Sequence, residues 1–326
     1  MNKVALFDSK PYDEEFFGKY AAQYGIELTY HDSRLSPKTC VLAEDAEAVV
    51  AFVNDDICAK TIDKLHGMGL KAIAMRSAGY NNVDIKHARD RLKVYRVPAY
   101  SPNSVAEHAM AMLLCLVRKI HRAHNRVREF NFGLQGLMGF DLNKKKMGVI
   151  GTGKIGQCFI EICKGFGMEI LAYDPFPLER DDIRYAAKEE IFRESDIIAL
   201  HCPLTHDNHY IINKASLRMM KDGVYIVNTS RGGLIDTEAL LDALKREKVA
   251  GACLDVYEEE SGVFFEDKSG DVINDDTLQL LISNNNVLLT SHQAFFTSEA
   301  IDTIAVTTLR NLRDCFDGKP SDNEIA

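Results

Sequence analysis

Short runs of apolar residues alternate with stretches of mixed polarity along almost the whole chain. In the first hundred residues, five apolar runs have the length and composition of buried β-strands; they span residues 3–8, 27–31, 48–53, 71–76 and 93–97. Between several of these runs the apolar positions recur at helical spacing, as in residues 14–24 and 59–67. Strands that alternate with helices are typical of an α/β fold with a mostly parallel sheet.

The same alternation starts again after a long helical pattern. Pro102 favours the start of a helix, Asn103 or Ser104 can cap it, and apolar residues continue through Val117. Six further apolar runs follow, over residues 147–151, 169–174, 197–201, 224–229, 250–256 and 287–290. Six strands with intervening helices match a complete doubly wound nucleotide-binding domain. A last helical pattern covers residues 297–316.

The composition narrows the possible partners. The chain of 326 residues carries a formal net charge of −9, which argues against a nucleic acid or an anionic membrane as partner. The basic cluster Lys144–Lys146 is interpreted as a solvated turn before a strand, with phosphate binding as the alternative. The longest apolar run, residues 109–117, is far too short to span a membrane, and the N-terminal apolar stretch is too short for a signal peptide. We therefore expect a soluble cytoplasmic protein.

Two histidine pairs, His121/His124 and His206/His209, could in principle hold a metal ion. Neither pair has a third ligand at a recognisable zinc spacing. The sequence therefore predicts no metal site.

A glycine-rich turn follows the apolar run at residues 147–151. Gly151, Gly153 and Gly156 form a Gly-x-Gly-x-x-Gly pattern, and a helical pattern over residues 157–166 comes next. Gly151 permits a tight turn, Gly153 lets the backbone approach a pyrophosphate, and Gly156 lets the helix pack close to the strand. The start of the helix then offers N–H groups and a partial positive charge to the phosphates.

The next predicted strand ends at Asp174, 18 residues after Gly156. A carboxylate at this place can accept hydrogen bonds from the adenosine ribose, and it would repel a 2′-phosphate. The pattern therefore predicts NAD rather than NADP as the cofactor. Two other interpretations stay open at this point: a structural turn that binds no ligand, and a methyltransferase that uses S-adenosylmethionine.

Three later strands are each followed by a polar side chain that could take part in catalysis. Arg231 follows the run at 224–229, the acidic run Glu258–Glu260 follows 250–256, and His292 follows 287–290. Because ligands of open α/β sheets bind beyond the carboxyl ends of the strands, we expect these groups to lie at one site.

The three side chains suit the reduction of a 2-oxo acid. Arg231 can bind the substrate carboxylate through two charge-assisted hydrogen bonds and polarise the neighbouring carbonyl. His292 can deliver a proton to the carbonyl oxygen while the cofactor delivers hydride to the carbon. Glu260 would stabilise the protonated imidazole. Each of them could alternatively be a surface or turn residue, and the hypothesis depends on their joint occurrence behind the glycine-rich turn.

Several segments, in the right order, resemble the D-2-hydroxyacid dehydrogenase family, and within it the lactate-forming branch. The resemblance extends from about residue 76 to residue 300. The matching segments are residues 76–84, 99–108, 130–132 with 139–141, 151–156, 201–204, 227–233, 255–258 and 291–296. The extra segment 262–276 also resembles the lactate-forming branch and favours pyruvate as the substrate.

The resemblance implies a role for three groups of residues. The catalytic residues would be Arg231, Glu260 and His292, where Glu260 matches as the third residue after Tyr257. The substrate-binding residues would be Ser77, Ala78, Gly79, Tyr100 and Phe295, with the last forming an apolar wall together with Phe296. The residues that line NAD would be Gly151, Gly153, Lys154, Ile155, Gly156, Asp174, Cys202, Pro203, Asn208, Thr229, Ser230 and Asp255.

The resemblance also implies the architecture. Residues 1–100 and 297–326 would form a flavodoxin-like substrate domain, and residues 101–296 a Rossmann NAD-binding domain inserted into it, with the active site in the cleft. The helix after Pro102 would mediate assembly into a homodimer or homotetramer. The implied activity is the reversible NADH-dependent reduction of pyruvate to D-lactate. The alternatives are a dehydrogenase for a bulkier 2-hydroxy acid, such as 2-hydroxyisocaproate, and an NAD(H)-sensing corepressor that binds protein partners.

Overall fold

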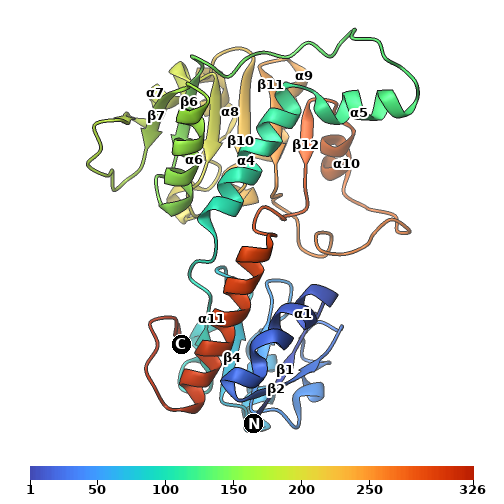
Figure 1. Ribbon diagram of the computed structural model, residues 1–326, viewed down its shortest axis with the longest axis vertical. Helices are drawn as coiled ribbons and strands as arrows, with labels where there is room; N and C mark the ends of the chain where they lie inside the picture. The colour runs from blue at the N-terminus through green and yellow to red at the C-terminus, as the bar shows by residue number, and fades with distance from the viewer. The chain divides into compact units, whose positions relative to one another are not determined.

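Two separate parallel sheets organise the chain (Figure 1). The structure is a computed structural model that describes all 326 residues. Unit 1 comprises residues 1–101 and 296–326, and unit 2 comprises residues 102–295. Unit 1 is therefore assembled from both ends of the chain, and unit 2 from the continuous segment between them.

Unit 1 is built on a five-stranded parallel sheet with the order β2-β1-β3-β4-β5. Its strands are β1 (Asn2–Leu6), β2 (Ile26–Tyr30), β3 (Ala48–Ala51), β4 (Ala72–Met75) and β5 (Lys93–Tyr95). The inner strands β3 and β4 are buried at every residue, because helices cover both faces of the sheet. The order 2-1-3-4-5 is that of a flavodoxin-like sheet.

The helices of unit 1 come from both ends of the chain. They are α1 (Pro11–Tyr20), α2 (Ala59–Gly67), α3 (Ile85–Ala88) and α11 (Ser298–Phe316). Helix α11 lies beside α1 and contributes Ala305, Leu309 and Leu312 to the core on one face of the sheet (Figure 1). Beyond α11 the chain returns along β5, where Ile325 donates a backbone hydrogen bond to Val94.

Unit 2 is built on a seven-stranded parallel sheet with the order β12-β11-β10-β9-β6-β7-β8. Its strands are β6 (Lys146–Ile150), β7 (Glu169–Tyr173), β8 (Arg184–Tyr185), β9 (Ile197–Leu200), β10 (Val224–Asn228), β11 (Val249–Leu254) and β12 (Val287–Leu289). In chain order within the unit this is 3-2-1-4-5-6-7, the doubly wound arrangement of dinucleotide-binding domains with one strand added. The strand order reverses between β6 and β9, where such sheets bind their ligands.

Helices cover both faces of this sheet. They are α4 (Pro102–Val117), α5 (Ile120–Arg128), α6 (Lys154–Gly165), α7 (Lys188–Glu194), α8 (Lys214–Met219), α9 (Thr237–Lys245) and α10 (Asp276–Ser283). Helices α4 and α6 pack against each other and share one core cluster with the sheet (Figure 1). Helices α8, α9 and α10 contribute Leu217, Leu240 and Leu281 to the cluster on the opposite face.

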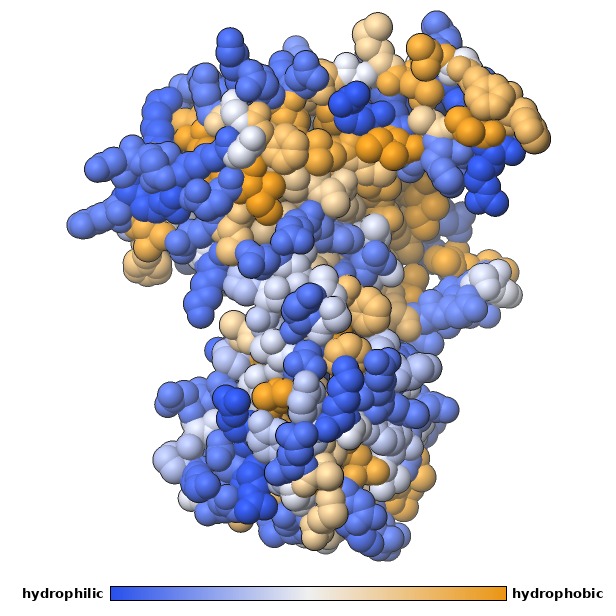
Figure 2. Space-filling model, in the orientation of Figure 1, coloured by the Kyte–Doolittle hydropathy of each residue, from blue (hydrophilic) through white to orange (hydrophobic).

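One segment of unit 2 exposes large apolar side chains. We call residues 120–139, which contain α5, the arm. Val127, Phe130, Phe132, Leu134 and Met138 are all more than half exposed, with Phe130 at 85% and Met138 at 88%. Figure 2 shows apolar side chains gathered over this part of the molecule, at the upper right. Gly139 lies so close to the carbonyl oxygen of Val117 that a Cβ would collide with it, so the arm returns to the end of α4.

The predicted α/β fold with two parallel sheets is confirmed, but several predicted boundaries are wrong. Helix α4 begins at Pro102 itself, so Asn103 and Ser104 lie in its first turn and do not cap it. Lys146, placed in a turn by the sequence, begins β6. Strand β1 stops before Asp8, whose φ of 50° is incompatible with a strand. Strand β8 was not predicted because two residues are too few for a visible pattern.

No helix combines the length and the apolar character that crossing a membrane would require. The cytoplasmic location stays a prediction.

Candidate active site

The glycine-rich turn between β6 and α6 is shaped by close backbone contacts. Gly151 has φ of +99°, and a Cβ there would lie 2.6 Å from the carbonyl carbon of His201. A Cβ on Gly156 would collide with the carbonyl oxygen of Gly151. A Cβ on Gly153 would meet nothing within 4 Å. Two of the glycines are therefore required by the turn, and the third leaves open space in front of the helix.

That open space lies at the N-terminus of α6. Gly153 is the N-cap residue and provides no side-chain cap. Lys154 and Ile155 form the first turn, whose N–H groups have no acceptor within the helix. Free N–H groups and the helix dipole attract anions. This open space in front of α6, which we call the cradle, therefore fits the pyrophosphate of a dinucleotide.

Asp174 directly follows β7, beside the turn. One of its oxygens, Oδ2, accepts hydrogen bonds from the N–H of Thr152 at 2.7 Å and from the hydroxyl of Thr152 at 3.2 Å. The other, Oδ1, accepts the N–H of Phe176 at 2.9 Å. These bonds fix the carboxylate beside the glycine-rich turn, where Oδ1 keeps a further lone pair for a ribose hydroxyl.

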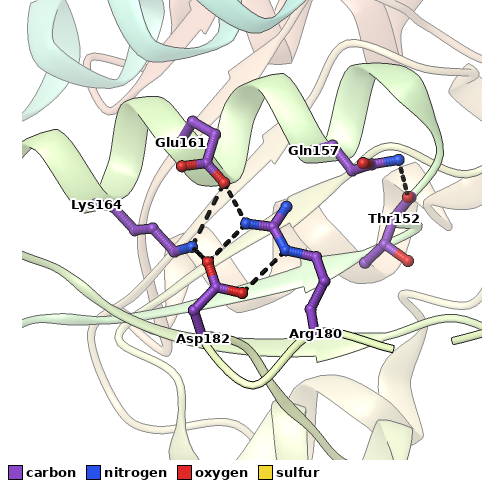
Figure 3. Close-up of polar contacts among 6 residues, drawn as sticks. All are labelled: Thr152, Gln157, Glu161, Lys164, Arg180 and Asp182. Atoms are coloured by element: carbon purple, nitrogen blue, oxygen red, sulfur yellow. Dashed lines mark hydrogen bonds and ion pairs between the residues drawn. The ribbon is translucent and has the colours of Figure 1, made fainter. Parts of the chain in front are cut away.

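The loop after Asp174 is tied to α6 by ion pairs (Figure 3). Arg180 in the loop pairs with Asp182 at 2.7 Å and with Glu161 of α6. Lys164 of α6 contacts the same two carboxylates. Arg180 and Lys164 hold the pKa of Asp182 below its usual range. The network thus joins the loop after Asp174 to helix α6.

The end of β9 supplies the residues on the other side of the strand-order reversal. Asn208 donates to the carbonyl of Pro203 at 2.7 Å and contacts the sulfur of Cys202 at 3.8 Å. Burial raises the pKa of Cys202 to about 11, with a smaller contribution from Asp174, so this residue remains a thiol. Burial lowers the pKa of His201 to about 4, and neither ring nitrogen has a hydrogen-bond partner. His201 is therefore neutral near pH 7 and cannot serve as the proton donor.

The end of β10 is organised by a buried asparagine. Asn228 accepts the N–H of Ser230 at 3.0 Å and donates to the carbonyl of Arg231 at 2.9 Å. The hydroxyl of Ser230 donates to the carbonyl of Leu200 at 2.8 Å, whereas the buried hydroxyl of Thr229 has no partner. Arg231 is half-buried, and its Nη1 donates to the carbonyl of Ser230 at 2.7 Å.

A histidine and a glutamate meet at the ends of β11 and β12. Nδ1 of His292 lies 3.0 Å from Oε1 of Glu260, and the two side chains are 21% and 28% exposed. The backbone of His292 is in the left-handed region, with φ of 54°. Such strain costs stability and concentrates at functional sites. The pair leaves Nε2 of His292 to act on a ligand.

The neighbouring acidic residues are used differently. Glu258 accepts hydrogen bonds from the backbone N–H and the hydroxyl of Thr237, at the start of α9. Gly232 lies against the backbone of Tyr257 and Glu258, where any Cβ would collide. This close approach brings the loop that carries Arg231 against the loop that leads to Glu260.

Asp255 is completely buried and holds the segment after His292 in place. Its carboxylate accepts the N–H groups of Gln293 at 2.9 Å and Ala294 at 2.8 Å, and the hydroxyl of Thr290 at 2.5 Å. Burial raises the pKa of Asp255, but hydrogen bonds from His108, Thr290 and the two N–H groups outweigh it and lower the net value. Asp255, predicted to line NAD, thus directs both oxygens to donors of the protein itself.

The sequence interpretation missed His108 of α4. Its Nε2 lies 3.2 Å from the hydroxyl of Thr290 and 3.5 Å from Asp255. A visible signal existed, because His108 interrupts the apolar face that Val105 and Met112 share at helical spacing.

The predicted substrate-binding residues Ser77, Ala78, Gly79 and Tyr100 belong to unit 1, and Phe295 ends unit 2. Ser77 donates its hydroxyl to the carbonyl of Gly79 at 2.7 Å, and its own carbonyl accepts the N–H of Val97 at 3.1 Å. The N–H groups of Ser77, Ala78 and Gly79 find no acceptor in the chain. Free N–H groups on successive residues are available to bind an anion.

No group of three or more His, Cys, Asp or Glu side chains is placed to hold a metal ion. His206 is exposed next to Asp207, and His209 stacks on Tyr210. His121 contacts the sulfur of Cys115.

The fold and the site together define a dinucleotide-dependent oxidoreductase. A family model described as "D-isomer specific 2-hydroxyacid dehydrogenase, NAD binding domain" matches residues 110–294. A D-lactate dehydrogenase of Escherichia coli strain K12 is 48% identical over 328 residues, which cover 99% of each chain. The chain belongs to the D-isomer-specific 2-hydroxyacid dehydrogenase family.

Solved structures agree with this result. The apo-structure of D-lactate dehydrogenase from Escherichia coli matches with a TM-score of 0.92 and 45% identity, covering 99% of this chain and 100% of that one. A structure described as the pyruvate reductase of Chlamydomonas reinhardtii matches with a TM-score of 0.95 and 38% identity, covering 99% and 98%. The predicted family and the predicted cofactor, NAD, are confirmed.

Proposed function

We propose that this protein is an NADH-dependent reductase of small 2-oxo acids that converts pyruvate to D-lactate. The observation that carries the proposal is the contact of 3.0 Å between His292 and Glu260 at the carboxyl ends of adjacent strands of the NAD-binding domain. The loop of Arg231 lies against the same segment. The names of the relatives support lactate as the product.

Arg231 binds the substrate carboxylate in this proposal. Its planar guanidinium forms two parallel hydrogen bonds with a carboxylate, which a lysine cannot reproduce. Its charge also polarises the adjacent carbonyl as negative charge grows on the oxygen. Asn228 and Ser230 keep the Arg231 loop in place through the hydrogen bonds at the end of β10.

His292 is the proton donor to the carbonyl oxygen, and it takes the proton back in the reverse reaction. The carboxylate of Glu260 fixes the ring through Nδ1 and stabilises its positive charge, so Nε2 carries the transferred proton. Bound NADH supplies the hydride. Its pyrophosphate would be held by the first turn of α6, and its adenosine ribose by Asp174.

The free N–H groups of Ser77, Ala78 and Gly79 are proposed to bind the substrate carboxylate as well. Tyr100 and Phe295 are proposed to limit the size of the substrate. One methylene in an apolar pocket changes binding by only about 1–3 kcal/mol, so the size preference should be graded rather than absolute.

The test uses purified protein with NADH or NADPH and a panel of pyruvate, 2-oxobutyrate, 2-oxoisocaproate and phenylpyruvate. We expect fastest NADH oxidation with pyruvate, much slower NADPH oxidation, and D-lactate as the product by chiral chromatography. A faster reaction with 2-oxoisocaproate than with pyruvate would mean that the physiological product is a bulkier 2-hydroxy acid rather than lactate. No turnover with any member of the panel would refute the proposal.

We also propose that the protein is a homo-oligomer and that the arm binds a second copy of the chain. The apolar residues of α4, predicted to mediate assembly, mostly face the core of unit 2. The arm instead presents contiguous exposed aromatic and aliphatic side chains. Such patches are rare on monomers and mark interaction sites. In the most common assembly, a symmetric dimer, the same patch of each copy takes part.

Light scattering coupled to size-exclusion chromatography tests this. The wild type is expected as a dimer or tetramer, and the double variant Phe130→Ser/Met138→Ser as a smaller species. Val272→Ser, at an equally exposed apolar residue outside the arm, is the matched control. A monomeric wild type, or an unchanged assembly in the double variant, would contradict the role of the arm.

A further inference from the structure

A buried guanidinium directly precedes the loop with the three free N–H groups. Arg76 follows β4 and is only 4% exposed. Its Nη1 lies 3.4 Å from Asp13 of α1, and its Nη2 donates to the carbonyl of Asp8 at 2.8 Å. Its Cζ lies 4.2 Å from the centre of the Phe52 ring. One side chain thus contacts α1 and the segments that follow β1 and β3.

The backbone around Arg76 is fixed as well. The N–H of Arg76 donates to the carbonyl of Ala51 at 2.9 Å, and the carbonyl of Ser77 accepts the N–H of Val97 at 3.1 Å. Further along, Asn82 donates to the carbonyls of Phe52 at 2.9 Å and Asp55 at 2.8 Å. The loop between Arg76 and Asn82 is therefore held at both ends, and only its N–H groups remain without acceptors.

Stability alone does not account for this arrangement. Asp8, Asp13 and Asp55 are each about as buried as Arg76, and the Nε of Arg76 has no hydrogen-bond partner. A buried ion pair is often no more stabilising than apolar side chains of the same volume, and a buried donor without a partner is unfavourable. What the guanidinium provides is a defined orientation, because its flat, branched head contacts three segments at once.

We propose that Arg76 is a positioning residue that orients the N–H groups of Ser77, Ala78 and Gly79 toward the carboxylate of the substrate. The guanidinium anchors the end of β4 to α1 and to the Phe52 ring. The loop that starts at the next residue therefore needs little reorganisation when the carboxylate binds, and less of the binding energy is lost. This inference rests on the proposed function of the loop.

The experiment compares Arg76→Gln, Arg76→Lys, Asp13→Asn and the double variant Arg76→Gln/Asp13→Asn. The double variant removes the guanidinium and its partner charge on Asp13 together. It therefore leaves no unpaired carboxylate at Asp13 and should fold even if Arg76→Gln alone does not. In the double variant we expect the KM for pyruvate to rise about tenfold or more while the Kd for NADH stays within about twofold. Arg76→Lys should recover part of the loss.

Hydrogen exchange supplies a second measurement that does not depend on turnover. The amides of Ile57, Val83 and Val97 donate to carbonyls of residues 77–82 and should exchange faster in the double variant, whereas the amides within β3 and β4 should not. Arg91→Gln is the matched control, because Arg91 is a more exposed arginine of the same unit that pairs with Asp63 at 3.4 Å.

An unchanged KM and unchanged exchange in the double variant would overturn the positioning role. The positioning role would also be overturned if the affinities for pyruvate and for NADH fell by the same factor, in proportion to a drop in Tm. That result would indicate general destabilisation. A wild type that reduces no 2-oxo acid would reject the proposed function, and this inference with it. If the wild type is active and the Arg76 variants have the same KM for pyruvate as the wild type, only this inference is rejected.

Discussion

The carboxyl ends of the two parallel sheets carry charged side chains in opposite ways. In unit 1, Asp8, Asp13, Asp55 and Arg76 are at most 4% exposed and are used up by contacts within the protein. In unit 2, His292 and Glu260 keep 21% and 28% of their side-chain surface. The same edge of a similar sheet therefore holds these fixed charges in unit 1, whereas in unit 2 it holds accessible charges beside the one buried carboxylate of Asp255.

The difference separates two tasks. Buried, paired charges hold backbone segments in a set arrangement, and what unit 1 offers to a ligand is a row of N–H groups. A side chain that transfers a proton must reach its substrate and change charge at low cost, which requires partial exposure. Unit 2 holds the segment after His292 with one buried carboxylate, Asp255, and fixes its other loops by the close backbone contact at Gly232 and the hydrogen bonds of Asn228.

The largest expected effect comes from removing the accessible acid–base group. His292→Gln should lower kcat for pyruvate reduction about 10³-fold, within the range usual for general acid–base catalysis. The Kd for NADH, from fluorescence titration, should change little, because His292 lies away from the glycine-rich turn. His66→Gln, at an exposed histidine of unit 1, is the control. Nearly full activity of His292→Gln would assign the proton transfer to another group.

The second effect concerns the shape of the accessible charge. Arg231→Lys keeps the charge but loses the bidentate geometry, so kcat/KM for pyruvate should fall about 100-fold. Steady-state kinetics measures the change, and Arg246→Lys, at the exposed residue that follows α9, serves as control. A change smaller than about threefold would show that the charge alone is sufficient and that the planar fork of arginine is not needed.

A backbone contact, rather than a charge, is the target of the third test. Gly232→Ala forces apart the loops of Arg231 and Glu260 and should lower the free energy of unfolding by about 2 kcal/mol, as overpacking does. Urea denaturation measures it. Gly165→Ala, where a Cβ meets nothing within 4 Å, should not lower the free energy of unfolding, because alanine favours a helix more than glycine does. Equal stability of both variants would mean that the contact at Gly232 can relax without loss.

The smallest effect tests a buried charge of unit 1. Burial raises the pKa of Asp55 from 3.8 to about 6, so the folded state holds this proton more tightly than the unfolded chain. Its contribution to stability is highest at low pH and falls as the pH rises from about 4 to about 6 and beyond. Between pH 5 and pH 7 the wild type should lose about 1 kcal/mol from this group, whereas Asp55→Asn should not.

In urea denaturation at the two pH values, the free energy of unfolding of Asp55→Asn should therefore rise relative to that of the wild type as the pH rises. Exposed Asp45→Asn is the control and should follow the wild type. A difference that is independent of pH would indicate that Asp55 keeps an ordinary titration in the folded protein.

The sequence predicted the sheets well because the strands of parallel sheets are continuous apolar runs. Boundaries were less accurate where a polar residue belongs to the site rather than to the strand. Residues 71–76 were predicted as one strand, but Arg76 turns out of it to meet α1. Helix α5 was not predicted, because it has no buried residue and thus no apolar face turned to the core.

The site residues were predictable where one short segment carries the signal. Gly151, Gly153 and Gly156 stand together, and Asp174 lies at a set distance. The cluster around Arg76 was not predictable, because its members are spread from Asp8 to Asp55 and only the fold brings them together. His108 was visible as a polar residue on an apolar helix face, but its partners Asp255 and Thr290 lie far away in sequence.

The position of helix α11 in the chain has a consequence for folding during synthesis. It comes from the last part of the chain, yet Ala305, Leu309 and Leu312 complete a core whose strands lie in the first hundred residues. On the ribosome, unit 2 has all its residues before α11 emerges, so it can fold while unit 1 still lacks a helix. Residues 1–101 lack one covering helix until α11 has been synthesised, so unit 1 can complete its core only after unit 2 has all its residues.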